Sequence, residues 1–111
     1  MEELEKLRED IEKRLRSFEK IVIREIRRSM QSKPIHTNDE AHDVRGRTIN
    51  GRYEYQGNHI DDMRYLRLIE SFHVYDEWDF KNLGHSGWIL TKKAERLYQE
   101  LVNKGYFRKR R

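Results

Sequence analysis

Apolar residues recur at intervals of three and four along the first thirty residues, which is the spacing of one face of an α-helix. Up to Arg16 this stripe is one residue wide and the rest of the surface is charged, whereas beyond Phe18 it widens toward Met30. The pattern predicts one helix of up to 30 residues whose second half is a core helix. The stripe consists of Leu4, Leu7, Ile11, Leu15, Phe18, Val22 and Ile26.

The first half of this predicted helix, residues 1–17, needs a partner, because its charged i,i+4 pairs contribute only about 0.2–0.5 kcal/mol each. Two interpretations are open. The segment is an arm that forms a homodimer or docks onto another protein, or it folds back on its own domain. Of these we expect the homodimer through the N-terminal helix. The globular domain is then expected over residues 18–107, with a basic tail at residues 108–111.

A proline and an Asn-Gly pair divide the stretch that follows. Pro34 ends the long helix because it lacks a backbone N–H and restrains the residue before it. Residues 37–40 have the form of a capping box, which predicts a short helix through Val44. Asn50 and Gly51 tolerate the positive φ angles of tight turns, so residues 48–53 are predicted to form a hairpin turn.

A further helix is predicted to begin after Asn58, which is a suitable N-cap. Apolar residues follow it at helical spacing, so this helix is expected to reach Phe72. β-rich residues at 74–80, turn-like residues at 81–87 and an apolar run at 88–90 then predict a two-stranded hairpin. The helical stripe consists of Ile60, Met63, Leu66, Ile69 and Phe72.

The last predicted helix is capped by Thr91 and stopped by Gly105. Its apolar stripe consists of Ala94, Leu97, Tyr98, Leu101 and Val102.

The order helix, hairpin, helix resembles winged helix-turn-helix proteins of the multiple-antibiotic-resistance and phenolic-acid regulator type. It is also similar to small phage and bacterial winged-helix proteins of unassigned role. The resemblance covers residues 58–102, and it rests on the run in which the hairpin returns through Leu90 and Thr91 directly into a helix with Lys93 and Leu97. It implies an α+β winged helix-turn-helix domain with a long N-terminal helical arm, acting as a small DNA-binding regulator or as an accessory protein of a phage, plasmid or bacterial genome.

Composition bounds the class of protein. With 111 residues, 35% hydrophobic and 40% charged, one domain with a small core is expected. The absence of cysteine excludes disulfides and thiolate metal ligands. No apolar run is long enough to span a membrane, and the charged start is unlike a secretory signal, so we expect a cytoplasmic protein.

The net charge of +4 is distributed unevenly. Residues 91–111 carry eight Lys and Arg against two Asp and Glu, whereas residues 58–90 carry three against six. A basic end of this kind is typical of a surface that meets phosphates. We therefore expect double-stranded DNA as a partner.

If residues 59–72 form a recognition helix, its polar side chains face outward toward base edges and phosphates. The wing and the basic residues beyond it would contact the DNA backbone. The expected DNA-binding residues are Arg64, Tyr65, Arg67, Ser71, Lys81, His85, Lys92, Lys93, Arg108, Lys109, Arg110 and Arg111.

Carboxylates in the same region favour a different partner. Asp61 and Asp62 stand at the end of the predicted helix that normally reads bases. They are helix caps, intramolecular partners of Arg64 and Arg67, or readers of cytosine amino groups. Residues 76–79 add three acids to the wing. The alternative function is therefore a winged-helix interaction module whose arm and acidic wing dock into a larger assembly.

No motif for catalysis, a cofactor or a metal is present. The five histidines match no recognised zinc pattern, and no glycine-rich phosphate loop occurs. A ribonuclease-like site from Arg52, Tyr53, Tyr55 and His59 is conceivable because acid–base chemistry needs no linear motif. We favour the simpler interpretation that these tyrosines pack by their rings on a strand, and we expect no enzyme.

Overall fold

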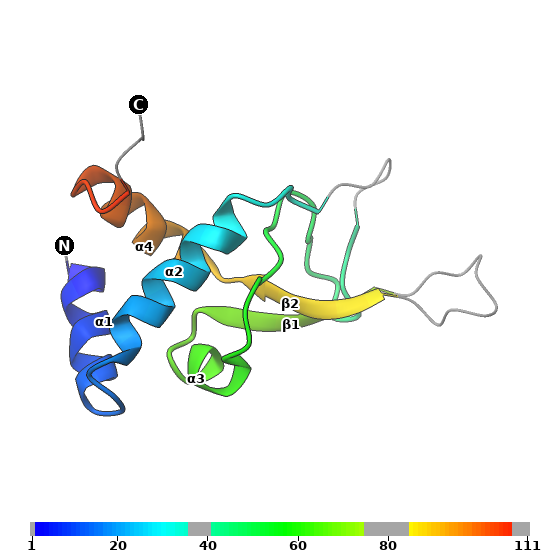
Figure 1. Ribbon diagram of the computed structural model, residues 1–111. Helices are drawn as coiled ribbons and strands as arrows, with labels where there is room; N and C mark the ends of the chain where they lie inside the picture. The colour runs from blue at the N-terminus through cyan, green and yellow to red at the C-terminus, as the bar shows by residue number, and fades with distance from the viewer. Residues whose placement is uncertain (1, 36–40, 75–84, 108–111) are drawn as a thin grey trace.

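The computed structural model describes residues 2–35, 41–74 and 85–107 (Figure 1). Within them the chain is α+β, as predicted, with four helices and one two-stranded antiparallel sheet. The helices are α1 (Glu2–Glu12), α2 (Phe18–Met30), α3 (Ile60–Tyr65) and α4 (Lys92–Asn103), and the strands are β1 (Ile69–Val74) and β2 (His85–Leu90).

The prediction of a single N-terminal helix is wrong, because the chain bends at residues 13–17 and α1 folds back beside α2 (Figure 1). Leu4 and Leu7 are fully buried, whereas Leu15 is 59% exposed although it belongs to the same apolar stripe. A straight helix of thirty residues would be about 45 Å long and would leave the first half of the stripe in water. Burial of that half outweighs the hydrogen bonds lost at the bend.

Polar contacts also hold α1 against the rest of the chain. The backbone N–H of Leu4 donates to Glu100 Oε2 of α4 at 3.2 Å. Glu3 pairs with Arg96 of α4 at 3.0 Å, and Arg8 pairs with Glu19 of α2 at 3.1 Å. The arm therefore folds back on its own domain, and a homodimer through its apolar stripe would have to displace α4.

Helix α3 is much shorter than predicted, since residues 69–72 belong to β1. Arg67 adopts a left-handed conformation with φ +58°. The N–H of Leu68 donates to Met63 O and the N–H of Arg67 donates to Arg64 O, both at 2.9 Å, which is the pattern of a Schellman motif. Glycine normally occupies the position of Arg67, so the sequence gives no local sign of this helix end.

Replacing Arg67 by Gly is expected to raise the free energy of unfolding by about 1 kcal/mol, because glycine adopts positive φ without steric cost. The midpoint of urea unfolding measures this. The matched control, Arg64→Gly inside α3, should lower the free energy of unfolding by about 1 kcal/mol. A loss of stability at both positions would contradict the role of the left-handed residue.

The sheet separates two layers of core. Strands β1 and β2 pair in register from Ile69↔Leu90 to Val74↔His85, so alternate pairs face opposite sides. Ile69 and Leu90 face the helices and join the main core, whereas Phe72 and Ile89 pack with Ile49 of the segment that covers the other face. The predicted second strand of the hairpin is confirmed as β2. The first strand was predicted to begin at Val74, but β1 begins at Ile69 and ends at Val74. Residues 75–84 lie outside the described residues.

The spacing of Ile69 and Phe72 explains why the helix after Asn58 was predicted to continue to Phe72. Three residues apart on a strand, they face opposite sides of the sheet, and both sides are covered. The same spacing on a helix would place them on one face. Periodicity alone cannot distinguish these cases.

Residues 41–44 form no helix, so the short helix predicted through Val44 is wrong where the structure describes it. His42 bridges Thr48, and Asp43 Oδ1 accepts from the N–H groups of Arg45 and Arg47 at 2.9 and 3.0 Å. An aspartate that binds nearby backbone in this way favours a turn over a helix. Residues 37–40, where this helix was predicted to start, lie outside the described residues.

A tight turn does occur at Asn50 and Gly51, where the N–H of Arg52 donates to Ile49 O at 3.1 Å and Gly51 has φ +81°. Its flanks pair with different segments rather than with each other. Thr48 bridges His42, whereas Glu54 bridges Ile89 of β2. The predicted turn is therefore confirmed without the predicted hairpin.

Helix α4 agrees with its sequence signals. Thr91 is its N-cap and accepts from the N–H of Ala94 at 3.3 Å, and Gly105 follows the helix with φ +77°. Ala94, Leu97 and Leu101 are buried, while Val102 lies at the edge of the stripe. No helix in the described part of the chain is long and apolar enough to cross a membrane.

Candidate nucleic-acid interface

Three basic residues, Lys6, Arg67 and Lys93, line one pocket where α3 ends and α4 begins, and Arg64 and Lys92 lie close to them along the chain. We call all of these residues the hairpin-base cluster. The hydroxyl of Thr91 donates to Arg67 O at 2.7 Å, and the N–H of Thr91 donates to Leu68 O at 3.0 Å. These two bonds fix the start of α4 against the end of α3.

Lys6, Arg67 and Lys93 share a polar pocket of about 290 Å³ with Asp10 and Tyr65. The Lys93 ammonium donates to Leu66 O at 2.9 Å. Burial lowers the pKa of Lys93; Asp10 and Glu3 oppose this shift, while Lys6 and Arg67 add to it by repulsion. The lining of this pocket carries three cations against one carboxylate, which suits an anionic partner.

An arginine in the bend at residues 13–17 neutralises part of the negative charge in the first turn of α3. Arg14 pairs with Asp62 at 2.9 Å, and its guanidinium lies 3.9 Å from the centre of the Tyr65 ring. The intramolecular partner of Asp62 is thus Arg14, whereas the sequence suggested Arg64 or Arg67. Asp61 is exposed and remains an obstacle to phosphates at that end of α3.

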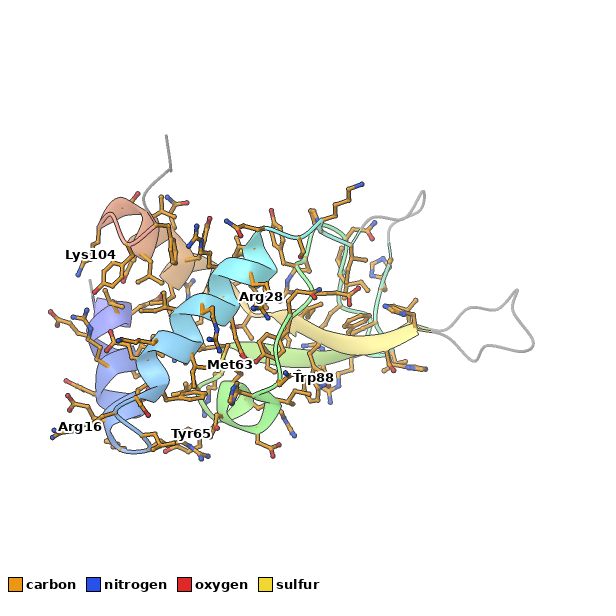
Figure 2. The ribbon with its side chains drawn as sticks, viewed as in Figure 1. Arg16, Arg28, Met63, Tyr65, Trp88 and Lys104 are labelled. Carbon is orange, nitrogen blue, oxygen red and sulfur yellow. The ribbon has the colours of Figure 1, made fainter. Side chains whose placement is uncertain are left out.

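The face of the hairpin next to α3 continues this surface. The guanidinium of Arg64 lies 5.1 Å from the Trp88 ring, and Ser71 is the cross-strand neighbour of Trp88. Figure 2 shows Trp88 and Tyr65 on opposite sides of α3. Ser71 is exposed on this face beside Trp88, on a strand rather than on the predicted helix.

His85 lies apart from these residues. It is on the other face of the sheet, with its ring 5.5 Å from that of Phe72 and its Nε2 3.5 Å from Glu54. Five residue steps along strand β2 separate His85 from Leu90 at the base of the hairpin, which corresponds to about 17 Å. Lys81 and residues 108–111, which the sequence also assigned to DNA, lie outside the described residues.

Comparisons with models of protein families, with curated proteins and with solved structures gave no significant match. The functional argument therefore rests on the residues themselves.

A second basic surface lies on α2 and was missed from the sequence. Lys20, Arg24 and Arg28 are exposed, and no carboxylate of the described residues pairs with them. The acids of α2 are withdrawn from this surface, because Glu19 pairs with Arg8 and Glu25 is buried. The near balance of charge over residues 1–31 concealed this segregation, which a helical projection of residues 18–30 could have revealed.

Two residues of the conceivable ribonuclease-like site, Arg52 and Tyr53, are held by other contacts. Arg52 donates to Glu70 Oε1 at 3.1 Å and to Leu90 O at 2.6 Å, and Tyr53 packs against the main core. Tyr55 and His59 do meet, beside the buried carboxyl group of Glu25.

Burial raises the pKa of Tyr55, and the hydrogen bond that its hydroxyl donates to Glu25 raises it further. The phenol therefore stays protonated at neutral pH and is a poor general base. Its role in the structure is to satisfy Glu25. Within the described residues, no group of three or more His, Cys, Asp or Glu side chains could hold a metal ion.

Proposed function

We propose that this protein is a non-catalytic, double-stranded DNA-binding protein that uses the hairpin-base cluster. The observation that supports this best is the convergence of Lys6, Arg67 and Lys93 from α1, the end of α3 and α4 on one pocket. Arg64 and Lys92 are exposed cations that lie within three residues of Arg67 and Lys93 along the chain. Cations held in this way replace counterions along a duplex, which is the main source of sequence-independent affinity.

The resemblance to winged-helix proteins supports the same function, because α3, the hairpin and α4 follow one another in the order expected of them. Residues 53–55 add to the edge of the hairpin, since the N–H of Tyr55 donates to Trp88 O and the N–H of Leu90 donates to Tyr53 O, both at 2.8 Å. We propose a winged-helix-like module on this basis.

Base reading by α3 is not part of this proposal. The helix has six residues, and Asp61 and Asp62 occupy its first turn, the end that enters the major groove in helix-turn-helix proteins. The cations lie instead at its last turn and beyond. Contacts to phosphates position a protein without reading sequence, so we expect weak sequence preference.

The test is a titration of the purified protein against a fluorescent random-sequence duplex at several salt concentrations. We expect a dissociation constant on the order of 1–100 μM near physiological salt, tightening as salt is lowered. Arg64→Ala combined with Arg67→Ala should weaken binding at least tenfold and reduce the slope of log affinity against log salt by about two.

The matched control combines Lys20→Ala with Arg24→Ala, which removes the same charge from the exposed face of α2. Its affinity should stay within twofold of the wild type. Equal losses in the two double variants would contradict a localised interface. Absence of binding at about 20 mM salt would overturn the DNA-binding function and leave the protein-interaction module as the better explanation.

A further inference from the structure

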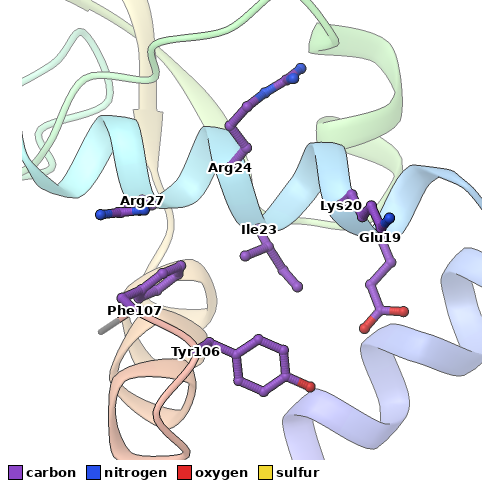
Figure 3. Close-up of a pocket in the computed structure, with 7 residues that line it drawn as sticks. All are labelled: Glu19, Lys20, Ile23, Arg24, Arg27, Tyr106 and Phe107. Atoms are coloured by element: carbon purple, nitrogen blue, oxygen red, sulfur yellow. The ribbon is translucent and has the colours of Figure 1, made fainter. Parts of the chain in front are cut away.

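An apolar groove of about 450 Å³ lies between α2 and the segment that follows α4. Figure 3 shows Ile23 pointing from α2 toward Tyr106, with Phe107 beside it. Phe107 stacks on Tyr98 with the ring centres 5.4 Å apart, and the guanidinium of Arg27 lies 5.3 Å from the Phe107 ring. The groove is thus lined by rings and an aliphatic side chain.

The rim of this groove is basic. Lys20, Arg24 and Arg27 line it, and Arg24 extends away from the rings, toward the outside of the groove (Figure 3). Glu19 is the acid on this rim, and Arg8 neutralises it at 3.1 Å. Four basic residues follow Phe107 directly in the sequence. An occupant should therefore combine negative charge with large apolar side chains.

One segment of this chain has that chemistry. Residues 75–80 read Tyr-Asp-Glu-Trp-Asp-Phe, with three acids, three aromatic residues and no base. They follow β1, and the hairpin extends away from α1 and α4, beside which the groove lies (Figure 1). The segment that fills a given groove would therefore come from another copy of the chain.

We propose that the groove binds residues 75–80 of a second copy. The acids would pair with Lys20, Arg24 and Arg27, and Trp78 would pack against Ile23 and Tyr106. The two surfaces differ, so the contact is head-to-tail and can continue from copy to copy.

The test uses a fluorescein-labelled peptide of residues 74–85 and the full-length protein, with anisotropy as the measurement and no DNA present. We expect saturable binding that weakens at least tenfold with Arg24→Glu plus Arg27→Glu in the protein. Replacing Asp76, Glu77 and Asp79 of the peptide by the corresponding amides should weaken it by a similar factor. Arg28→Glu, on the same helix but outside the groove lining, is the matched control and should stay within twofold.

Full-length protein provides a second measurement that does not risk unfolding α2. The mass from sedimentation should rise with concentration for the wild type and stay at one chain for the variant carrying Asp76→Asn, Glu77→Gln and Asp79→Asn. Equal binding of the amidated peptide, or stronger competition by a single-stranded oligonucleotide than by unlabelled peptide, would overturn the proposal. Because no duplex is used, neither result depends on the proposed DNA-binding function.

Discussion

Replacing Leu7 by Asp is expected to abolish the cooperative folding of the domain. Leu7 is fully buried, with no surface accessible to water. It packs in the core cluster that includes Leu4, Ile11 and Leu101. Losing a buried leucine costs about 2–5 kcal/mol, and burying a carboxylate in its place adds to that loss. Since domains of this size have about 5–15 kcal/mol of stability, most of it should disappear. Circular dichroism during thermal unfolding measures the effect.

Leu15→Asp is the matched control, because both residues belong to the same apolar stripe. Leu15 lies at the bend between α1 and α2 and is 59% exposed, so its replacement should change the free energy of unfolding by less than about 0.5 kcal/mol. A continuous arm open to a partner would give the opposite outcome: both variants would remain folded and lose only that partner. A folded Leu7→Asp variant would therefore disprove the packing of α1 on α4.

Elements with local stop and start signals could be predicted from the sequence. Thr91 caps α4 through its own side chain, and Gly105 takes the positive φ that follows the helix. Gly51 likewise marks its turn. In each case the deciding interaction lies within a few residues, so the residue type carries the information.

The two largest errors concern helix ends that tertiary packing decides. Residues 13–17 contain neither proline nor glycine, and Arg67 takes a conformation that usually belongs to glycine. The bend is favoured because it buries Leu4 and Leu7, and the end of α3 is favoured because Ile69 and Phe72 then reach both sides of the sheet. Neither gain can be deduced from neighbouring residues.

The candidate interface could be predicted only where its residues lie close together in the sequence. Arg64, Arg67, Lys92 and Lys93 stand close to one hairpin in the sequence, and Arg67 and Lys93 line one pocket in the structure. Lys6 joins them because α1 folds back, which the sequence left open. The groove beside Phe107 depends on how the end of the chain packs on α2, so no local pattern pointed to it.

Removal of the buried carboxyl group of Glu25 is the second change with a large expected effect. Glu25 is 3% exposed on α2 and accepts from the hydroxyl of Tyr55 and, at 3.4 Å, from the N–H of Asn58. Ser29, one turn further on, accepts from the N–H of Gln56 at 2.8 Å. The two side chains thus hold residues 55–58 against α2, immediately before α3 begins.

Glu25→Ala should lower the free energy of unfolding by about 3 kcal/mol, because it leaves the Tyr55 hydroxyl and the Asn58 N–H without an acceptor and opens a small cavity. Denaturant unfolding measures this loss. Glu19→Ala, on the same helix, is the control. Its pair with Arg8 is partly exposed, so the expected loss is below about 1 kcal/mol. Since Glu25 positions the entry to α3, the variant should also bind duplex DNA less tightly at temperatures where it remains folded. Equal stability losses at positions 25 and 19 would show that the contacts of Glu25 contribute no more than a surface ion pair.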